Sequence, residues 1–104
     1  MEHHFQYDER LGVSLPRLEQ EWRSYTSQEQ GLIIELWQQQ RAKIPERIYA
    51  MEQSIKEQQQ LLQEEENFQR SCEINREIAK LASIIHDLQI LFREDPELWA
   101  NDEQ

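Results

Sequence analysis

Hydrophobic side chains recur every three or four residues through the last third of the chain, and this spacing constrains the fold more strongly than any other feature. The positions are Ile74, Ile78, Leu81, Ile85, Leu88 and Phe92. Such a spacing places them on one face of a helix, in the a and d positions of a seam that packs on another helix. An earlier stretch repeats the pattern with Ile48, Met51, Ile55 and Leu62, although Gln58 places an amide in the seam. The pattern predicts two long helices that pack against each other.

The two stretches do not form one unbroken seam. Leu62 and Ile78 are sixteen residues apart, which is two more than a multiple of seven, so the register does not continue between them. Asn67 is a favourable N-cap, and glutamates at 64–66 would oppose the dipole at a helix C-terminus. We predict an antiparallel, coiled-coil-like hairpin with its bend at Glu65–Asn67 and its second helix from about Phe68 to Arg93. The alternative is one continuous helix of about 70 Å, at 1.5 Å per residue.

Two further boundaries are predicted before this hairpin. Ile44 precedes Pro45, and a residue before proline is pushed out of the helical region, so a helix ends here and the next begins at Pro45. Thr26 and Glu29 have the spacing of a capping box, which predicts the start of the helix that ends near Ile44. A single helix kinked near Thr26 is the alternative.

An earlier helix is predicted to begin at Pro16, because proline is favourable at the first helical position. Leu18, Trp22 and Tyr25 then fall on one face. Trp22 and Trp37 are expected in the core, since large aromatic side chains are the main burial units of so short a chain.

The predicted fold class is all-α: an antiparallel helical hairpin with one or two additional N-terminal helices in a small bundle. Only two glycines and three prolines are present, while glutamine occurs fifteen times, a composition typical of long helices with wide polar faces. Residues 1–14 are predicted to be an extended arm, residues 15–93 the helical bundle or hairpin domain, and residues 94–104 an acidic C-terminal tail with a short helix. Leu98 and Trp99 in this tail are candidate anchors for a partner.

The formal net charge of −10 argues against direct binding to nucleic acid or to anionic lipid, because both would be repelled. Cys72 is the only cysteine and cannot form an internal disulfide, which favours a reducing compartment. No apolar run approaches the length of a membrane span, and the first residues lack the pattern of a signal peptide. We expect a cytoplasmic protein with no membrane contact.

The residues that follow the predicted bend resemble the second half of a UVR motif, a helical hairpin found in bacterial excision-repair subunits and in some adaptors of Clp protease systems. The matching positions are Asn67, Phe68, Ser71, Cys72, Ile74, Glu77, Ile78 and Leu81. Asn75 and Arg76 depart from it, where the motif has arginine and an acid, and the upstream helix matches only through Ile55 and Leu62. The resemblance implies a hairpin that binds another hairpin or a protein partner, without catalysis.

No group of residues has the spacing of a catalytic or metal site. His3 and His4 are adjacent on the arm, His86 is distant, and neither a CxxC nor an HExxH spacing occurs. Cys72 has no histidine nearby in sequence and no glycine elbow, so we interpret it as a buried small residue. The glutamates at 64–66 would splay around a helix rather than converge on a cation. Three basic residues near Pro45 are interpreted as surface charge: Arg41, Lys43 and Arg47. We predict no catalytic residue, no metal and no cofactor.

The seam and the missing catalytic set favour a non-enzymatic protein–protein interaction module, a small acidic helical adaptor, regulator or inhibitor that acts through a helix face. The interaction seam would be the six positions from Ile74 to Phe92. Ile84 and Leu91 widen it, which suits either the N-terminal helices folding over it or a second chain packing against it, and we favour a homodimer. One alternative is an acidic mimic of nucleic acid that inhibits a DNA- or RNA-binding protein. A second alternative is a structural, self-assembling coiled coil. A third is an enzyme with an unrecognised site, which no motif in the sequence supports. The partner is a protein that the sequence does not name.

Overall fold

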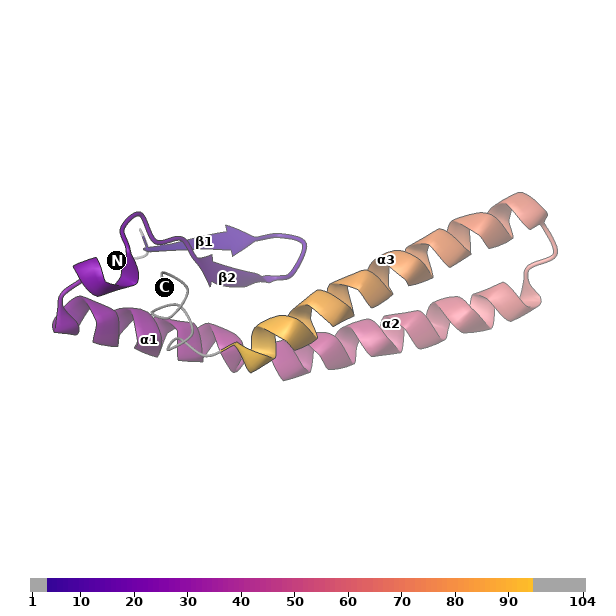
Figure 1. Cartoon of the computed structure of the whole chain (residues 1–104). Coiled ribbons are helices and arrows are strands. Elements are labelled where there is room, and N and C mark those ends of the chain that lie inside the picture. Colours follow the sequence, from indigo (N-terminus) through magenta and orange to yellow (C-terminus); the bar gives the residue numbers. More distant parts are fainter. Residues whose placement is uncertain (1–3, 95–104) are drawn as a thin grey trace.

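The computed structural model describes residues 4–94 as two short strands, a 3-10 turn and three helices (Figure 1). In chain order they are β1 (Phe5–Asp8), β2 (Val13–Pro16), η2 (Trp22–Ser24), α1 (Ser27–Arg41), α2 (Ile44–Glu64) and α3 (Phe68–Arg93). The two strands and α1 lie together at one end, and α2 and α3 project from them as a long hairpin (Figure 1). The chain is therefore mostly helical, as predicted.

The molecule is elongated. Its principal extents are 60 × 24 × 21 Å, and its radius of gyration is 18.1 Å, where a compact domain of this length would have about 13 Å. The excess length comes from the hairpin, which nothing covers over its outer half in the described part of the chain (Figure 1). We call the end beside α1 the root of the hairpin and the turn between α2 and α3 its tip.

The helix boundaries follow local signals in the sequence. The capping box at the start of α1 is present: the Glu29 N–H donates to Thr26 Oγ1 at 3.1 Å, and the Thr26 N–H donates to Glu29 Oε1 at 2.9 Å. After α1 ends at Arg41, a two-residue turn leads into α2, whose first turn contains Pro45. The chain bends there and continues in nearly the same direction (Figure 1). The predicted start of the second helix at Pro45 is confirmed to within a residue, whereas α1 ends at Arg41, three residues before the predicted end at Ile44.

The predicted antiparallel hairpin is confirmed, and the continuous helix is excluded. The α2 helix ends at Glu64, residues 65–67 form the connection, and α3 runs from Phe68 to Arg93. Asn67 is the N-cap of α3, with its side-chain oxygen accepting a hydrogen bond from the Arg70 N–H at 2.9 Å. A connection of three residues is typical of an antiparallel helical hairpin.

The all-α prediction is wrong for the N-terminal residues, where β1 and β2 pair antiparallel in the register Phe5 to Pro16. Gly12 has φ +79, which a glycine adopts without strain, and the Leu11 N–H donates to Asp8 Oδ1 at 2.9 Å to close the turn. The helix predicted to begin at Pro16 is therefore absent, because Pro16 ends β2 instead.

Pro16 can end β2 because its position in the ribbon requires no backbone N–H. The Arg17 N–H donates to the His4 carbonyl at 2.7 Å, and ladder bonds join alternate residue pairs in an antiparallel ribbon. The next pair, Phe5 with Pro16, thus falls between ladder bonds. The missing N–H of the proline costs no hydrogen bond of the sheet.

The segment that joins β2 to α1 is also not the predicted helix. Trp22–Ser24 is a single 3-10 turn, and the Tyr25 hydroxyl accepts from the N–H groups of Glu19 and Gln20 at 3.1 and 3.2 Å. A buried side chain thus replaces the helical partners of these backbone groups. Trp22 and Tyr25 are buried against Ile33 of α1, so the predicted burial of Trp22 is confirmed although its helix is not.

The main core lies at the root of the hairpin, where residues of the β-hairpin, α1, α2 and α3 pack together. It consists of six buried residues: Leu11, Val13, Trp37, Ile44, Ile84 and Leu88. Trp37 and Leu88 are completely inaccessible to solvent, which confirms the predicted burial of Trp37. Because this core lies where the β-hairpin turn meets α1, α2 and α3, it anchors the root and leaves the rest of the hairpin to its own two helices.

Candidate interaction surface of the helical hairpin

The predicted seam of α3 is divided between the inside and the outside of the protein. Leu88, Ile74 and Ile85 are buried, with exposed fractions of 0%, 2% and 9%. Ile78 and Leu81 are only half-buried. Phe92, the last seam residue, is 40% exposed, and the Arg41 guanidinium lies over its ring at 5.4 Å.

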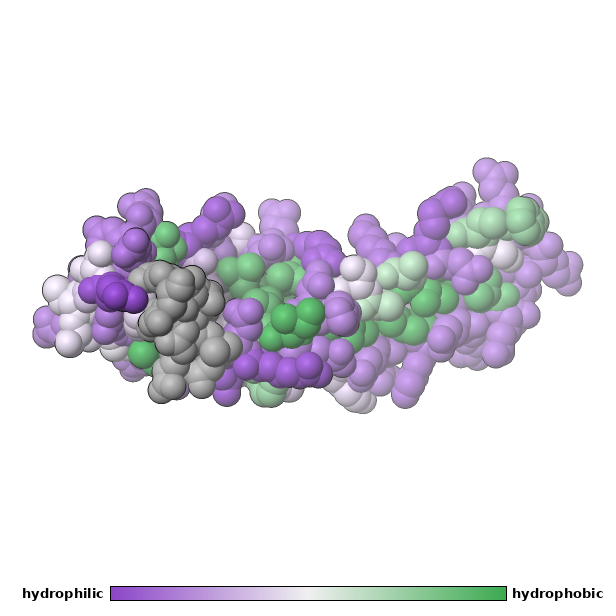
Figure 2. Space-filling view, in the orientation of Figure 1, coloured by the Kyte–Doolittle hydropathy of each residue, from purple (hydrophilic) through white to green (hydrophobic). Residues whose placement is uncertain are grey.

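The seam of α2 is more open still. Ile44, at the very start of α2, is the one residue of this helix that is buried. The seam residues beyond the root are only partly covered, including the polar Gln58. Two helices touch along a single line, so without a third layer both flanks of that line stay in contact with water. Figure 2 shows hydrophobic side chains reaching the surface along the hairpin, between hydrophilic ones.

We call five of these partly covered hydrophobic positions the open seam. It consists of Met51, Ile55 and Leu62 on α2 and of Ile78 and Leu81 on α3. Whether the seam binds a partner is not decided by its exposure, and its role as an interaction site stays a prediction. Leu98 and Trp99, the other candidate anchors, lie outside the described residues.

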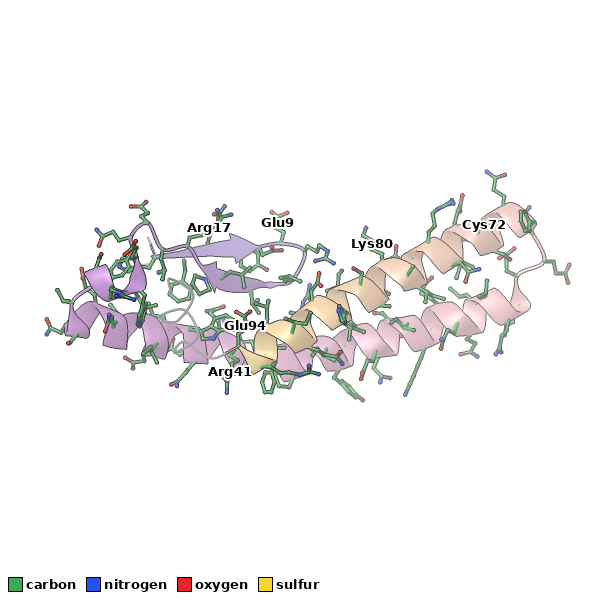
Figure 3. All side chains as sticks on the ribbon, in the orientation of Figure 1. Glu9, Arg17, Arg41, Cys72, Lys80 and Glu94 are labelled. Atoms are coloured by element: carbon green, nitrogen blue, oxygen red, sulfur yellow. The ribbon has the colours of Figure 1, made fainter. Side chains whose placement is uncertain are left out.

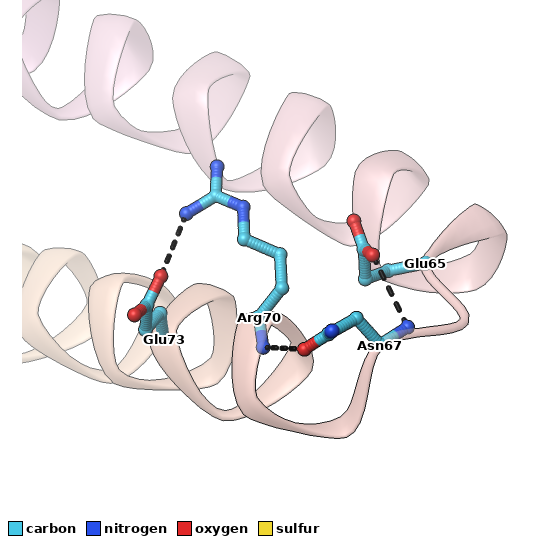
Figure 4. A network of polar contacts seen from close by, with 4 residues as sticks. All are labelled: Glu65, Asn67, Arg70 and Glu73. Atoms are coloured by element: carbon cyan, nitrogen blue, oxygen red, sulfur yellow. Dashed lines mark hydrogen bonds and ion pairs between the residues drawn. The ribbon is translucent and has the colours of Figure 1, made fainter.

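A short network of polar contacts holds the tip of the hairpin (Figure 4). The Asn67 N–H donates to Glu65 Oε2 at 3.2 Å, in addition to the capping bond from the Arg70 N–H to the Asn67 side chain. The Arg70 guanidinium is paired with Glu73 at 3.1 Å. The turn is thus fixed by local bonds, so the residues on it are presented in a defined position.

Phe68 is the most exposed of the large hydrophobic side chains within residues 4–94, with 83% of its surface accessible. It is the first residue of α3 and follows the capping Asn67 directly. Its position was readable from the sequence, because Phe68 lies six residues before Ile74, a spacing that places it off the seam. Our sequence reasoning assigned Phe68 to the motif resemblance and missed its exposure.

The basic residues near Pro45 lie at the root, at the opposite end of the hairpin from the tip. Arg41 donates to the Glu94 carbonyl at 3.2 Å, and both residues lie near the junction of α1 with the end of α3 (Figure 3). The Arg47 Nε donates to the Leu11 carbonyl at 3.1 Å and ties α2 to the β-hairpin turn. Lys43 is exposed. All three cations were interpreted from the sequence as surface charge. Two of them, Arg41 and Arg47, in fact donate hydrogen bonds that join separate segments of the chain.

The other candidate residues are scattered. Cys72 is half-buried near the tip (Figure 3), His86 is exposed, and His4 packs edge-on against Tyr25 at 5.4 Å. His3 lies outside the described residues. Within residues 4–94, no three side chains of histidine, cysteine, aspartate or glutamate come together as a metal site would require.

The clearest groove lies between the β-hairpin and α1 and has a volume of about 300 Å³. Its lining residues are Phe5, Tyr7, Ser14, Leu36, Gln39 and Gln40. Apart from the hydroxyls of Tyr7 and Ser14, this lining offers amides and hydrocarbon, so it contains no acid–base pair for catalysis. In the described part of the chain, no helix has both the length and the hydrophobicity needed to cross a membrane.

Comparison with known proteins does not place the chain in a family. No family model, no curated protein and no solved structure matches it. The resemblance of residues 67–81 to the UVR motif therefore stays a prediction. The structure defines an architecture, a long helical hairpin rooted on a small platform of two strands and one helix, and the function has to be argued from its surfaces.

Proposed function

We propose that this chain is a non-enzymatic protein–protein interaction module, an acidic helical adaptor, regulator or inhibitor that acts in the cytoplasm through the open seam of its hairpin. The observation that carries the proposal is that one hydrophobic pattern is covered unevenly along the hairpin. Leu88 is buried in the core at the root and Ile74 is buried nearer the tip, whereas Ile55, Ile78 and Leu81 between them are left half-covered. A helix face of this kind suits another helix.

The magnitude of the available burial indicates what kind of partner fits. Fully burying an aliphatic or methionine side chain is worth about 1.5–3 kcal/mol, and the five residues of the open seam are already half-buried. A partner that covered them completely would gain about 4–7 kcal/mol from this chain. Association costs on the order of 4–15 kcal/mol. The open seam needs a partner that contributes a comparable hydrophobic face.

A second copy of the chain is such a partner. In a homodimer that packs one open seam on the other, both copies contribute, and the gain doubles to about 8–14 kcal/mol. The product is a four-helix arrangement, in which each helix pair closes the flank of the other. We therefore propose a homodimer, and a helical segment of a different protein would use the same face. The UVR resemblance, which implies hairpin-to-hairpin binding, agrees with this reading.

The proposal is tested by making the open seam polar without disturbing the buried root. Ile78→Gln together with Leu81→Gln keeps good helix formers but removes two half-buried aliphatic side chains. Ala79→Gln, on the exposed side of the same helical turn, is the matched control. Light scattering should show a dimer for the unmodified protein and for the control, and a folded monomer for the double variant.

A partner of a different kind is tested with the same set of proteins. Affinity capture from the organism's own extract, compared across the unmodified chain, the control and the double variant, should yield proteins that only the double variant fails to retain. Equal recovery by all three proteins, combined with a monomeric unmodified chain, contradicts a role for the open seam. Acidic mimicry of nucleic acid predicts a different result, namely partner binding that falls steeply with salt and is insensitive to the seam substitutions.

A further inference from the structure

The two ends of the hairpin carry opposite charge. The tip, residues 61–73, contains four glutamates and one arginine, and that arginine is already paired with Glu73. This leaves Glu64, Glu65 and Glu66, which we call the tip glutamates. The root, residues 41–47, contains one carboxylate, Glu46, and three cations. These cations, Arg41, Lys43 and Arg47, we call the root cluster.

Neither group is neutralised within the described residues. Arg41 and Arg47 donate to main-chain carbonyls, and none of the three cations forms an ion pair with a carboxylate of residues 4–94. The tip glutamates likewise have no cationic partner in that part of the chain, and Glu65 accepts only the Asn67 N–H. Both groups are thus available to an oppositely charged surface.

The two charged groups flank the open seam. The α2 helix has 21 residues, which at 1.5 Å per residue is about 31 Å, and the part of it from Met51 to Leu62 spans about 17 Å. The open seam on this helix therefore lies between the root cluster and the tip glutamates. A partner as long as the hairpin itself, such as a second copy, covers the open seam and reaches both charged ends.

We propose that two copies pack their open seams antiparallel, with the tip glutamates of each copy against the root cluster of the other. Two-fold symmetry then makes the favourable contact twice. A parallel pair would instead place tip beside tip and root beside root, and like charges at close range are unfavourable. The antiparallel arrangement also brings the exposed Phe68 of each copy to the root of its partner.

This inference rests on the proposed homodimer and adds its orientation. Exposed ion pairs are each worth little, so the charge contacts select the orientation while the hydrophobic seam supplies most of the affinity.

The orientation is measured directly with one spin label on each chain. Glu66→Cys in a Cys72→Ser background places the label on the exposed turn at the tip. In a dimer, the distance between the two labels should be about 30 Å or more if the copies are antiparallel. Two tips that lie side by side would give less than about 20 Å, given the spacing of packed helices. The short distance overturns the inference and leaves the homodimer intact, whereas a monomer overturns both.

Charge reversal gives an independent test, in which the two orientations predict opposite signs. Glu66→Lys should weaken an antiparallel dimer about tenfold, because it damages two symmetric contacts, and should strengthen a parallel dimer. Adding Lys43→Glu to this variant should restore the dissociation constant to within about threefold of the unmodified protein. Glu77→Lys, the same change of charge on the exposed middle of α3, is the control. If Glu66→Lys weakens the dimer and adding Lys43→Glu does not restore its affinity, the proposed contact between the tip glutamates and the root cluster is contradicted.

Discussion

Replacing Gly12 by alanine should destabilise the protein through two effects at one position. Gly12 has φ +79, a conformation that costs an L-residue about 1–2 kcal/mol. In addition, a Cβ built on Gly12 would overlap the Arg47 Nε and would lie 2.7 Å from Arg47 Cζ. The guanidinium would have to move away from the Leu11 carbonyl, to which Nε donates at 3.1 Å. Hydrogen bonds to charged groups contribute about 1.5–3 kcal/mol.

The sum is a loss of about 2.5–5 kcal/mol in the free energy of unfolding, a large share of the 5–15 kcal/mol typical of a folded domain. Urea titration at low micromolar protein, followed by circular dichroism at 222 nm, measures it. With a denaturant slope of about 2 kcal/mol/M, the midpoint should fall by about 1–2.5 M. The slope itself should not change, since Gly12→Ala leaves the extent of burial as it is.

Gly31 provides a control with the identical chemical change and the opposite expected sign. It lies inside α1 with no heavy atom within 4 Å of an added Cβ, so Gly31→Ala should raise the free energy of unfolding by about 1 kcal/mol. A Gly12→Ala variant whose free energy of unfolding matches that of the unmodified protein within about 0.5 kcal/mol, which is roughly the measurement error, would contradict this prediction. In that case the turn would not hold Arg47 as the structure describes.

Three further variants test the root, the cap and the tip under the same conditions. Leu88→Ala should cost about 2–5 kcal/mol, because Leu88 is fully buried in the main core. Asn67→Ala should cost about 1 kcal/mol through the lost cap bond to the Arg70 N–H, whereas Asn75→Ala, on the exposed side of α3, should not destabilise at all. Phe68→Ala should change the free energy of unfolding by less than about 0.5 kcal/mol, because 83% of the side chain is already in water. A loss of 2 kcal/mol or more at Phe68, in the range of about 3–5 kcal/mol that buried aromatics show, would contradict its exposure.

The sequence alone determined the features that depend on neighbouring residues. The capping pair Thr26 and Glu29, the Asn67 cap and the break at Pro45 each act within a few residues of the chain, so their structural effect is readable without the fold. The register break between Leu62 and Ile78 is likewise a property of spacing, and it correctly predicted the hairpin and the bounds of α3.

Tertiary structure decided what happens where local signals are weak or compete. The alternation of Phe5 and Tyr7 is too short to predict a strand, and a two-stranded ribbon by itself has only marginal stability. It forms here because Leu11 and Val13 are buried against Trp37 and the two long helices. In the next segment, the spacing of Trp22 and Tyr25 fitted a helix, but the Tyr25 hydroxyl bonds backbone groups that a helix would have used.

The sequence also could not predict which seam residues would be buried and which would stay partly exposed. A heptad pattern marks every a and d position alike, because it records periodicity and not what lies opposite. Leu88 is fully buried because α1 and the β-hairpin pack on it, whereas Ile78 lies beyond them and is half-covered. The same holds for the root cluster, since the bond of Arg47 to the Leu11 carbonyl joins residues 36 positions apart. Contacts between segments so distant in the chain are set by the packing of the whole molecule, and local spacing carries no record of them.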